Sequence, residues 1–367
     1  MSGADPPTTQ WDPTPILGER LLRGNPYRFS LVILNQPIHN IPLFLDLWRR
    51  GMLTIHPFHP PYIETRAPLF PSPLPKDLIS LNLPTATVRI AADGGANRVH
   101  AIRAHLPPTR PKLDFIVGDL DSLRSEAREW FLQQPGLGSA GQQHIVEVPD
   151  QDSTDFAKAV KLARELSRKR AWGRPSAGGS NDQVEDIICY SGLGGRVDQA
   201  MSQLHHLYMF QRRRRPSDAT GNESAEAGTP ERPQDSDGYA SGRMYLTNGE
   251  SLTFVLLAGR HAIRIRDKLD HTPVPAAPNS ELEMKGASAT TASDAQKPTV
   301  FGKHVGIIPL AGPSLLTTRG LEWDVRDWET EFGGRMSTSN HTTPGSDVVE
   351  VETSRDVLFT IDIPVLV

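Results

Sequence analysis

The sequence contains one cysteine, Cys189, among its 367 residues. A single cysteine excludes an intrachain disulfide and any zinc site built from several cysteines. This usage is typical of a reducing compartment, so we expect a cytoplasmic location. Residues 1–15 lack the basic start and apolar stretch of a secretory signal, and none is predicted.

Long apolar runs and an excess of positive charge are also missing. Residues 29–48 are the most apolar segment, but asparagine, glutamine, proline, histidine and aspartate interrupt them, so no membrane span is predicted. The formal net charge is −4 and the isoelectric point is near 6.3. Because this balance gives no basic field, charge does not favour nucleic acid as a partner. Small molecules are the expected ligands.

Common nucleotide-binding and hydrolase motifs are absent as well. The chain has no Gly-x-x-x-x-Gly-Lys-Ser/Thr loop, and Gly192-x-Gly194 does not continue into a dinucleotide fingerprint. No Gly-x-Ser-x-Gly signature indicates a serine hydrolase.

The first half of the chain instead alternates apolar runs with helical patterns, which predicts a mostly parallel α/β sheet of Rossmann-like type. The predicted strands are residues 29–34, 87–92, 113–118, 144–148 and 186–191. Residues 154–170 show helical spacing, with Asp152 or Ser153 as the expected N-cap.

Beyond residue 243 the pattern changes to short alternating runs, such as 348–352 and 357–363. In the latter run, Val357, Phe359, Ile361 and Ile363 share one face, as a half-buried strand requires. A sheet with one apolar face needs a covering layer, so we expect a β-sandwich of jelly-roll type.

Segments rich in polar residues, proline and glycine complete the predicted organisation. They bury too little apolar surface to offset chain entropy, and we interpret the run Arg212–Arg215 as solvated chain. The predicted order is a disordered tail (1–25), an α/β domain (26–210) with an irregular insertion (51–85), a disordered insertion (211–242), and a β-sandwich (243–367) with a disordered insertion (about 267–300).

Acidic residues follow four of the predicted parallel strands. They are Asp93, Asp119, Asp121, Asp150, Asp152, Asp155 and Asp198. Any one could merely cap a helix, but ligands gather at this edge of an open α/β sheet, and crowded carboxylates favour a bound cation. Oxygen ligands indicate Mg²⁺. Asp119 and Asp121, two apart in an extended segment, can face one ion, and Ser122 is the expected cap of the following helix.

Glycines and arginines at the same strand ends indicate a phosphate ligand. Gly94 and Gly95 stand at one turn, and Gly192, Gly194 and Gly195 at another, where bare backbone can approach an anion. Arg98 and Arg196 are the nearby cations.

Taken in order, the motifs DGGANR (93–98), GDLDS (118–122), DQDSTDF (150–156) and GGRVDQ (194–199) resemble the catalytic domain of thiamine pyrophosphokinases. The segments 306–325, 332–340 and 349–363 resemble the same family's second domain. The resemblance implies transfer of diphosphate from ATP to thiamine with Mg²⁺, by a homodimer whose active site is shared between the α/β domain of one subunit and the β-sandwich of the other.

The resemblance also implies residue roles. Expected catalytic residues are Asp93, Asp119, Asp121, Asp155 and Asp198, of which Asp119, Asp121 and Asp155 hold the metal. Expected ATP-binding residues are Gly94, Gly95, Arg98, Ser122, Thr154 and Arg196. Expected thiamine-binding residues are Gln151, Trp323 and Ser337, with Trp328 as the alternative aromatic residue.

Two other functions remain open at this point. The Asp-x-Asp pair also occurs in nucleotide-sugar glycosyltransferases, and a non-catalytic relative could keep the fold as a binding module. The second-domain motifs disfavour the first alternative, and the intact acidic motifs disfavour the second.

Overall fold

A computed structural model describes residues 7–17, 27–50, 88–107, 113–133, 144–172, 185–211, 239, 242–266 and 300–364. The predicted insertion 51–85 and the run Arg212–Arg215 lie outside these ranges. So do residues 1–6 and 18–25 of the predicted tail, most of 211–242, and all but the last residue of 267–300.

Six parallel strands form one half of a ten-stranded sheet, in the order β7-β6-β2-β3-β4-β5. They are β2 (Phe29–Ile33), β3 (Arg89–Ala92), β4 (Phe115–Gly118), β5 (His144–Glu147), β6 (Asp186–Tyr190) and β7 (Met244–Thr247). The first five are the predicted runs, each shortened by one or two residues. β2, β3 and β4 are buried throughout, as expected for a parallel sheet covered on both faces.

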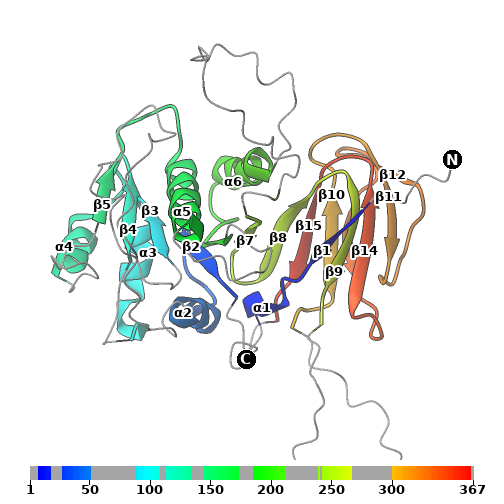
Figure 1. Cartoon of the computed structure of the whole chain (residues 1–367), viewed down its shortest axis with the longest axis horizontal. Coiled ribbons are helices and arrows are strands. Elements are labelled where there is room, and N and C mark those ends of the chain that lie inside the picture. Colours follow the sequence, from blue (N-terminus) through cyan, green and yellow to red (C-terminus); the bar gives the residue numbers. More distant parts are fainter. Residues whose placement is uncertain are drawn as a thin grey trace, which may run out of the picture.

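Helices connect and cover these strands (Figure 1). They are α2 (Ile41–Arg50), α3 (Gly95–Ala101) followed by a 3₁₀ turn η3 (Arg103–His105), α4 (Ser125–Gln133), α5 (Asp155–Trp172) and α6 (Val197–Gln211). α5 packs along β2, β3 and β4, and α6 along β7 and β8. The predicted helix 154–170 is confirmed as α5. Its cap differs from the prediction, because the Thr154 hydroxyl oxygen accepts the N–H of Ala157 at 3.1 Å.

The ten-stranded sheet continues into the second half of the chain without a break. Antiparallel strands extend it past β7, in the order β13-β10-β15-β8. They are β8 (Ser251–Leu256), β10 (His304–Ile308), β13 (Ser337–His341) and β15 (Val357–Asp362). The domain boundary predicted at residues 211–242 therefore needs correction, because β7 follows that segment and still belongs to the parallel half.

A second sheet of five strands covers the antiparallel half and completes the sandwich (Figure 1). Its order is β1 (Thr8–Trp11), β9 (Gly259–Arg264), β14 (Val348–Thr353), β11 (Ser314–Arg319) and β12 (Trp328–Thr330). The rings of Trp11 on β1 and Phe254 on β8 stack between the two sheets with centroids 4.6 Å apart. The predicted combination of a parallel α/β half with a β-sandwich is thus confirmed.

Two predictions of disorder are wrong at particular residues. The predicted tail contains β1 and a short helix α1 (Thr14–Leu17). Trp11 is 2% exposed, and its Nε1 donates to the Nδ1 of buried His261. Tyr239, within the predicted insertion 211–242, is also buried, and its hydroxyl bonds the backbone of Val255 and Leu257. A single buried aromatic residue does not produce a periodic hydrophobic pattern, so the sequence did not indicate that these segments are ordered.

No helix among the described ranges has both the length and the apolar character needed to cross a membrane.

Candidate functional site

Three carboxylates meet at the carboxyl ends of β3 and β4. Asp93 follows β3 directly, and Asp119 follows β4, its parallel neighbour. Ligand oxygens of Asp93, Asp119 and Asp121 all lie within 4.8 Å of one another. The predicted convergence of acidic residues at this sheet edge is therefore present for these three.

Close backbone packing allows the three carboxylates to meet. A Cβ at Gly118 would lie 2.6 Å from the Cβ of Asp93 and 2.9 Å from an oxygen of Asp155. Asp93 and Leu120 adopt positive φ angles of 38° and 66°, which turn the chain sharply after each strand. A Cβ at Gly95 would lie 2.2 Å from the carbonyl oxygen of Ile33, so glycine is needed there too.

Asp93 is the buried member of the group, with 2% exposure. Its Oδ2 accepts the N–H of Ser122 at 3.0 Å, while its Oδ1 is buried and has no hydrogen-bond partner within the described part of the chain. Burial raises the pKa of Asp93 to about 6, and the charges of Asp155, Asp121 and Asp119 add to this effect. A buried carboxylate oxygen without a hydrogen-bond partner is available to bind an ion or a water molecule.

The pKa of Asp119 shifts in the opposite direction. Its Oδ1 accepts the N–H of Asp121 and its Oδ2 accepts from Nε2 of Gln151, both at 3.3 Å. Burial acts to raise the pKa of Asp119, but these hydrogen bonds and the Lys158 charge outweigh it, and the pKa is lowered. Gln151, predicted to bind thiamine, therefore lies against the acidic group.

Asp155 lies beside this group but is already engaged. Its Oδ1 accepts from the backbone N–H of Asp119 at 3.2 Å and from Nζ of Lys158 at 3.1 Å. The predicted metal ligands were Asp119, Asp121 and Asp155, whereas the structure groups Asp93 with the first two. Lys158 lies one helical turn beyond Asp155 in α5 and pairs with Oδ1 of its carboxylate.

Asp121 and Ser122 form the exposed rim of the group. The Ser122 hydroxyl donates to Oδ1 of Asp121 at 2.9 Å. Ser122 does not cap the next helix as predicted, since α4 begins at Ser125 and the N–H of Arg124 donates to Oδ1 of Asn97.

Asn35 and Gln36, which the sequence reasoning missed, connect the two glycine loops. They follow β2, which lies between β3 and β6. Oδ1 of Asn35 accepts from Nε of Arg98 at 2.9 Å, and a Cβ at Gly94 would collide with the Asn35 amide. A Cβ at Gly195, where φ is 69°, would lie 2.7 Å from Oε1 of Gln36. Their position directly after the apolar run 29–34 was the available signal.

The remaining predicted residues near this edge have partners of their own. Arg196 and Asp198 form a two-bond ion pair at 3.1 and 2.5 Å, which lowers the pKa of Asp198 and leaves it outside the acidic group. Thr154 caps α5 and contacts Nε2 of His206 at 2.8 Å.

Trp323 and Ser337 lie at the far edge of the ten-stranded sheet. Trp323 is 54% exposed, and both its backbone N–H and its carbonyl bond the side chain of Asn340 on β13. Ser337 begins β13, the edge strand. Trp328 instead lies on β12 of the other sheet, under the guanidinium of Arg335.

Seven strand positions separate β13 from β3. At about 4.8 Å per step this is roughly 34 Å, so one chain does not bring Trp323 and Ser337 to the acidic group.

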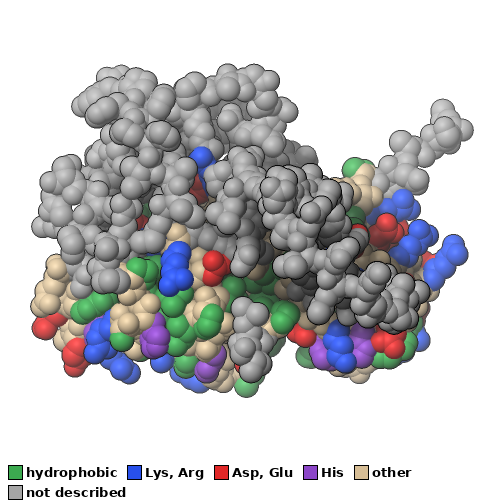
Figure 2. Space-filling model, turned by 90° about the horizontal axis from the view of Figure 1, so that it is seen from below, with side chains coloured by type: hydrophobic (Ala, Val, Ile, Leu, Met, Phe, Trp, Pro, Cys, Tyr) green, Lys and Arg blue, Asp and Glu red, His purple; other side chains and the backbone are tan. Residues whose placement is uncertain are grey.

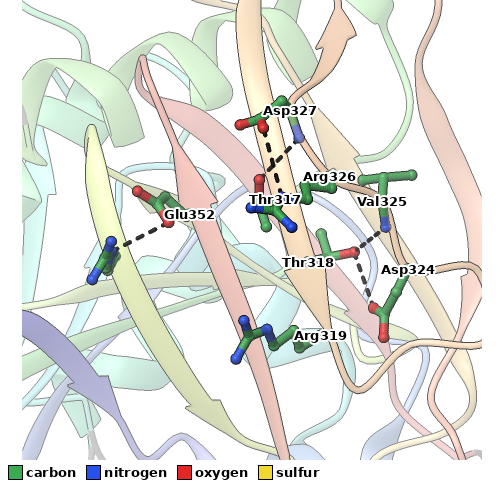
Figure 3. A pocket seen from close by; sticks show the side chains of 9 residues that line it. Thr317, Thr318, Arg319, Asp324, Val325, Arg326, Asp327 and Glu352 are labelled. Atoms are coloured by element: carbon green, nitrogen blue, oxygen red, sulfur yellow. Dashed lines mark hydrogen bonds and ion pairs between the residues drawn. The ribbon is translucent and has the colours of Figure 1, made fainter.

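A separate hollow of about 520 Å³ lies on the five-stranded sheet (Figure 3). Its lining residues are Arg260, Thr317, Thr318, Arg319, Asp324, Val325, Arg326, Asp327 and Glu352. Arg260 pairs with Glu352 at 3.2 Å, and Asp324 accepts from Thr318 at 3.0 Å. Its three arginines are balanced by three carboxylates, and none of the predicted site residues lines it.

Comparisons with known proteins agree with this architecture. Residues 80–217 match the family model "Thiamin pyrophosphokinase, catalytic domain", and residues 293–358 match "Thiamin pyrophosphokinase, vitamin B1 binding domain". Together the two matches span more than half of the chain.

Individual relatives carry the same name. Thiamine pyrophosphokinase 3 of Oryza sativa subsp. japonica is 28% identical over 76% of this chain and 79% of its own, and thiamine pyrophosphokinase 2 of Arabidopsis thaliana is 27% identical with the same coverage.

Two solved structures share the fold. Thiamin pyrophosphokinase from Candida albicans has a TM-score of 0.57 at 19% identity, covering 98% of this chain and 95% of its own. The yeast enzyme has a TM-score of 0.58 at 17% identity, covering 100% and 94%. Motifs, fold and both family models agree that the chain belongs to the thiamine pyrophosphokinase family.

Proposed function

We propose that the protein transfers the terminal diphosphate of ATP to the hydroxyl of thiamine, giving thiamine diphosphate and AMP in the cytoplasm. The group formed by Asp93, Asp119 and Asp121 is the observation that carries this proposal. Family membership supports it, because the rice and Arabidopsis relatives are named for this activity.

The three carboxylates fit a magnesium ion. They offer oxygen ligands within 4.8 Å of one another, and Oδ1 of Asp93 is buried without a hydrogen-bond partner among the described residues. Mg²⁺ prefers one or two carboxylates together with water and phosphate oxygens, as in other phosphoryl-transfer sites. Asp93, Asp119 and Asp121 would hold it, and when bound it would neutralise charge on the transferred diphosphate.

The surrounding residues position the nucleotide in this proposal. Asn35 holds the guanidinium of Arg98 beside the Gly94–Gly95 turn, and Arg196 lies at the next loop of the same edge. Phosphoryl transfer depends mainly on positioning and on stabilising charge as it develops. Lys158 and Asp155 support this positioning indirectly. Asp155 accepts the backbone N–H of Asp119, and Lys158 holds the Asp155 carboxylate in place.

Thiamine binding requires a second copy of the chain. Trp323 and Ser337 lie roughly 34 Å from the acidic group by strand spacing. We therefore propose a homodimer in which the edge around β13 of one subunit faces the acidic group of the other. Stacking of the cationic thiazolium on an exposed tryptophan would add about 0.5–2 kcal/mol.

Mixing inactive subunits tests this arrangement. Asp121→Asn and Trp323→Ala proteins, assayed at a thiamine concentration well below KM where each alone has little activity, should recover about a quarter of wild-type activity after subunit exchange, because half of the dimers are mixed and each has one intact site. Native mass spectrometry verifies the exchange. If activity stays at the parental level after verified exchange, each subunit completes its own site.

Product analysis tests the chemistry itself. Purified protein with ATP, Mg²⁺ and thiamine should yield AMP and thiamine diphosphate in equal amounts. Thiamine binding without AMP formation would indicate a non-catalytic relative, and turnover of a nucleotide sugar instead would indicate a glycosyltransferase.

A further inference from the structure

A pair of histidines lies on the edge of the sandwich, away from the carboxylate group. His304 on β10 and His341 on β13 are directly opposite each other in the antiparallel register. Their ring centroids are 5.0 Å apart with an interplanar angle of 71°. Histidine side chains come to the surface beside acidic ones at the sandwich end of the molecule (Figure 2). The side chains of His304 and His341 are 51% and 24% exposed.

Each ring is oriented by a carboxylate through its Nδ1 atom. Nδ1 of His304 lies 3.2 Å from Oδ2 of Asp362, whose other oxygen accepts the backbone N–H of His304 at 2.7 Å. Nδ1 of His341 lies 2.6 Å from Oε2 of Glu322. A carboxylate at Nδ1 places the proton there and leaves the Nε2 lone pair of a neutral imidazole free to bind a metal ion.

The separation of the two rings suits one ion. With metal–nitrogen bonds of about 2.0–2.1 Å, two imidazoles on one tetrahedral ion have ring centres roughly 5 Å apart. Imidazole favours zinc, copper and nickel over magnesium, and the two carboxylates at Nδ1 are the usual outer partners of such ligands.

We propose that Nε2 of His304 and Nε2 of His341 bind one divalent transition-metal ion such as Zn²⁺. Water or a soluble ligand completes its coordination. This site uses imidazoles rather than the carboxylate group. It lies beside Trp323 on the β13 edge proposed as the subunit interface, and metal binding there does not require diphosphate transfer. The ring of Trp323, with its centroid 5.0 Å from that of His341, would report on the bound metal.

Calorimetric titration with Zn²⁺ at pH 7.5 tests the proposal. All proteins carry Asp121→Asn and the buffer contains excess Mg²⁺, so that the carboxylate group does not contribute. We expect one Zn²⁺ to bind with a dissociation constant in the micromolar range. His304→Ala and His341→Ala should each weaken binding at least tenfold. His105→Ala removes another exposed histidine and should bind as the parent does.

Copper quenching provides a second measurement. Cu²⁺ should quench a part of the tryptophan fluorescence that is missing in Trp323→Phe and in the His304→Ala, His341→Ala double variant. Unchanged Zn²⁺ affinity and unchanged quenching in that double variant, with an unchanged melting temperature, would overturn the proposal. Failure of the parent to bind Zn²⁺ at 1 mM would overturn it equally.

Discussion

The two ends of the ten-stranded sheet are built in contrasting ways. At the parallel end, Asp93 is buried and Gly118 leaves no space for a side chain. At the antiparallel end, Trp323 and Ser337 lie at an open edge, where the Asn340 side chain bonds the backbone N–H and carbonyl of Trp323. The first region is prearranged within one chain, whereas the second offers surface that a second chain can complete. Substitutions at the first end should therefore damage chemistry, and those at the second end should damage substrate binding.

The largest effect is expected for Asp121→Asn. The amide removes the charge that holds Mg²⁺ against the phosphates, so turnover should fall at least 100-fold with an unchanged melting temperature. AMP release measures the effect. Asp152→Asn, an exposed carboxylate on the nearby loop, serves as the control and should stay near wild type. Near-normal turnover of Asp121→Asn at saturating Mg²⁺ would remove this residue from the site.

Gly118→Ala should break the packing of the same end. The added methyl would overlap Asp93 and Asp155, so we expect a loss of about 1–3 kcal/mol in unfolding free energy and a clear fall in turnover. Urea unfolding and AMP release measure both. Gly345→Ala, which meets nothing within 4 Å, is the matched control. Equal stability of the two variants would show that the parallel end is less tightly packed than the distances indicate.

Trp323→Ala tests the antiparallel end of the sheet. Loss of stacking worth about 0.5–2 kcal/mol should raise KM for thiamine by up to roughly 30-fold, while KM for ATP stays nearly constant. Trp328→Ala, on the other sheet, should leave KM for thiamine unchanged. The reverse result would assign the stacking role to Trp328.

The smallest effect concerns His206, which supports the start of α5 through Thr154. Burial lowers the pKa of His206 in the folded protein, and the nearby His205 and Lys161 charges add to this. The unfolded state therefore takes up the proton first. The stability that the neutral His206 ring contributes is fully present above about pH 6.5 and decreases as the pH falls below this value.

Unfolding free energies of wild type and His206→Gln between pH 7.5 and 5 measure this contribution. The wild type should lose more stability than the variant on acidification. His205→Gln, which changes an exposed ring, should stay close to the wild type because burial is the largest cause of the lowered His206 pKa. Parallel curves for wild type and His206→Gln would contradict the assignment.

Much of the site was predictable because strand ends have a sequence signature. Apolar runs followed at once by Asp93, by Asp119 or by glycines indicated a parallel sheet with acidic loops at one edge, and the structure has this arrangement. Asn35 and Gln36 also follow an apolar strand, but because they carry no charge they were not predicted as site residues. The resemblance assigned Asp119, Asp121 and Asp155 to the metal, whereas the structure groups Asp93 with the first two, and sequence order does not reveal that Lys158 pairs with Asp155.

By itself, the sequence determined the strands, the α5 helix and the acidic strand ends, since hydrophobic periodicity and motif position are local properties of the chain. Only the tertiary structure decided that β7 joins the parallel strands, that Trp11 and Tyr239 anchor segments predicted to be disordered, and that His304 faces His341. It also decided that Trp323 lies at the opposite edge of the sheet from Asp119. These features depend on strand order and on contacts between distant segments, which no local pattern encodes.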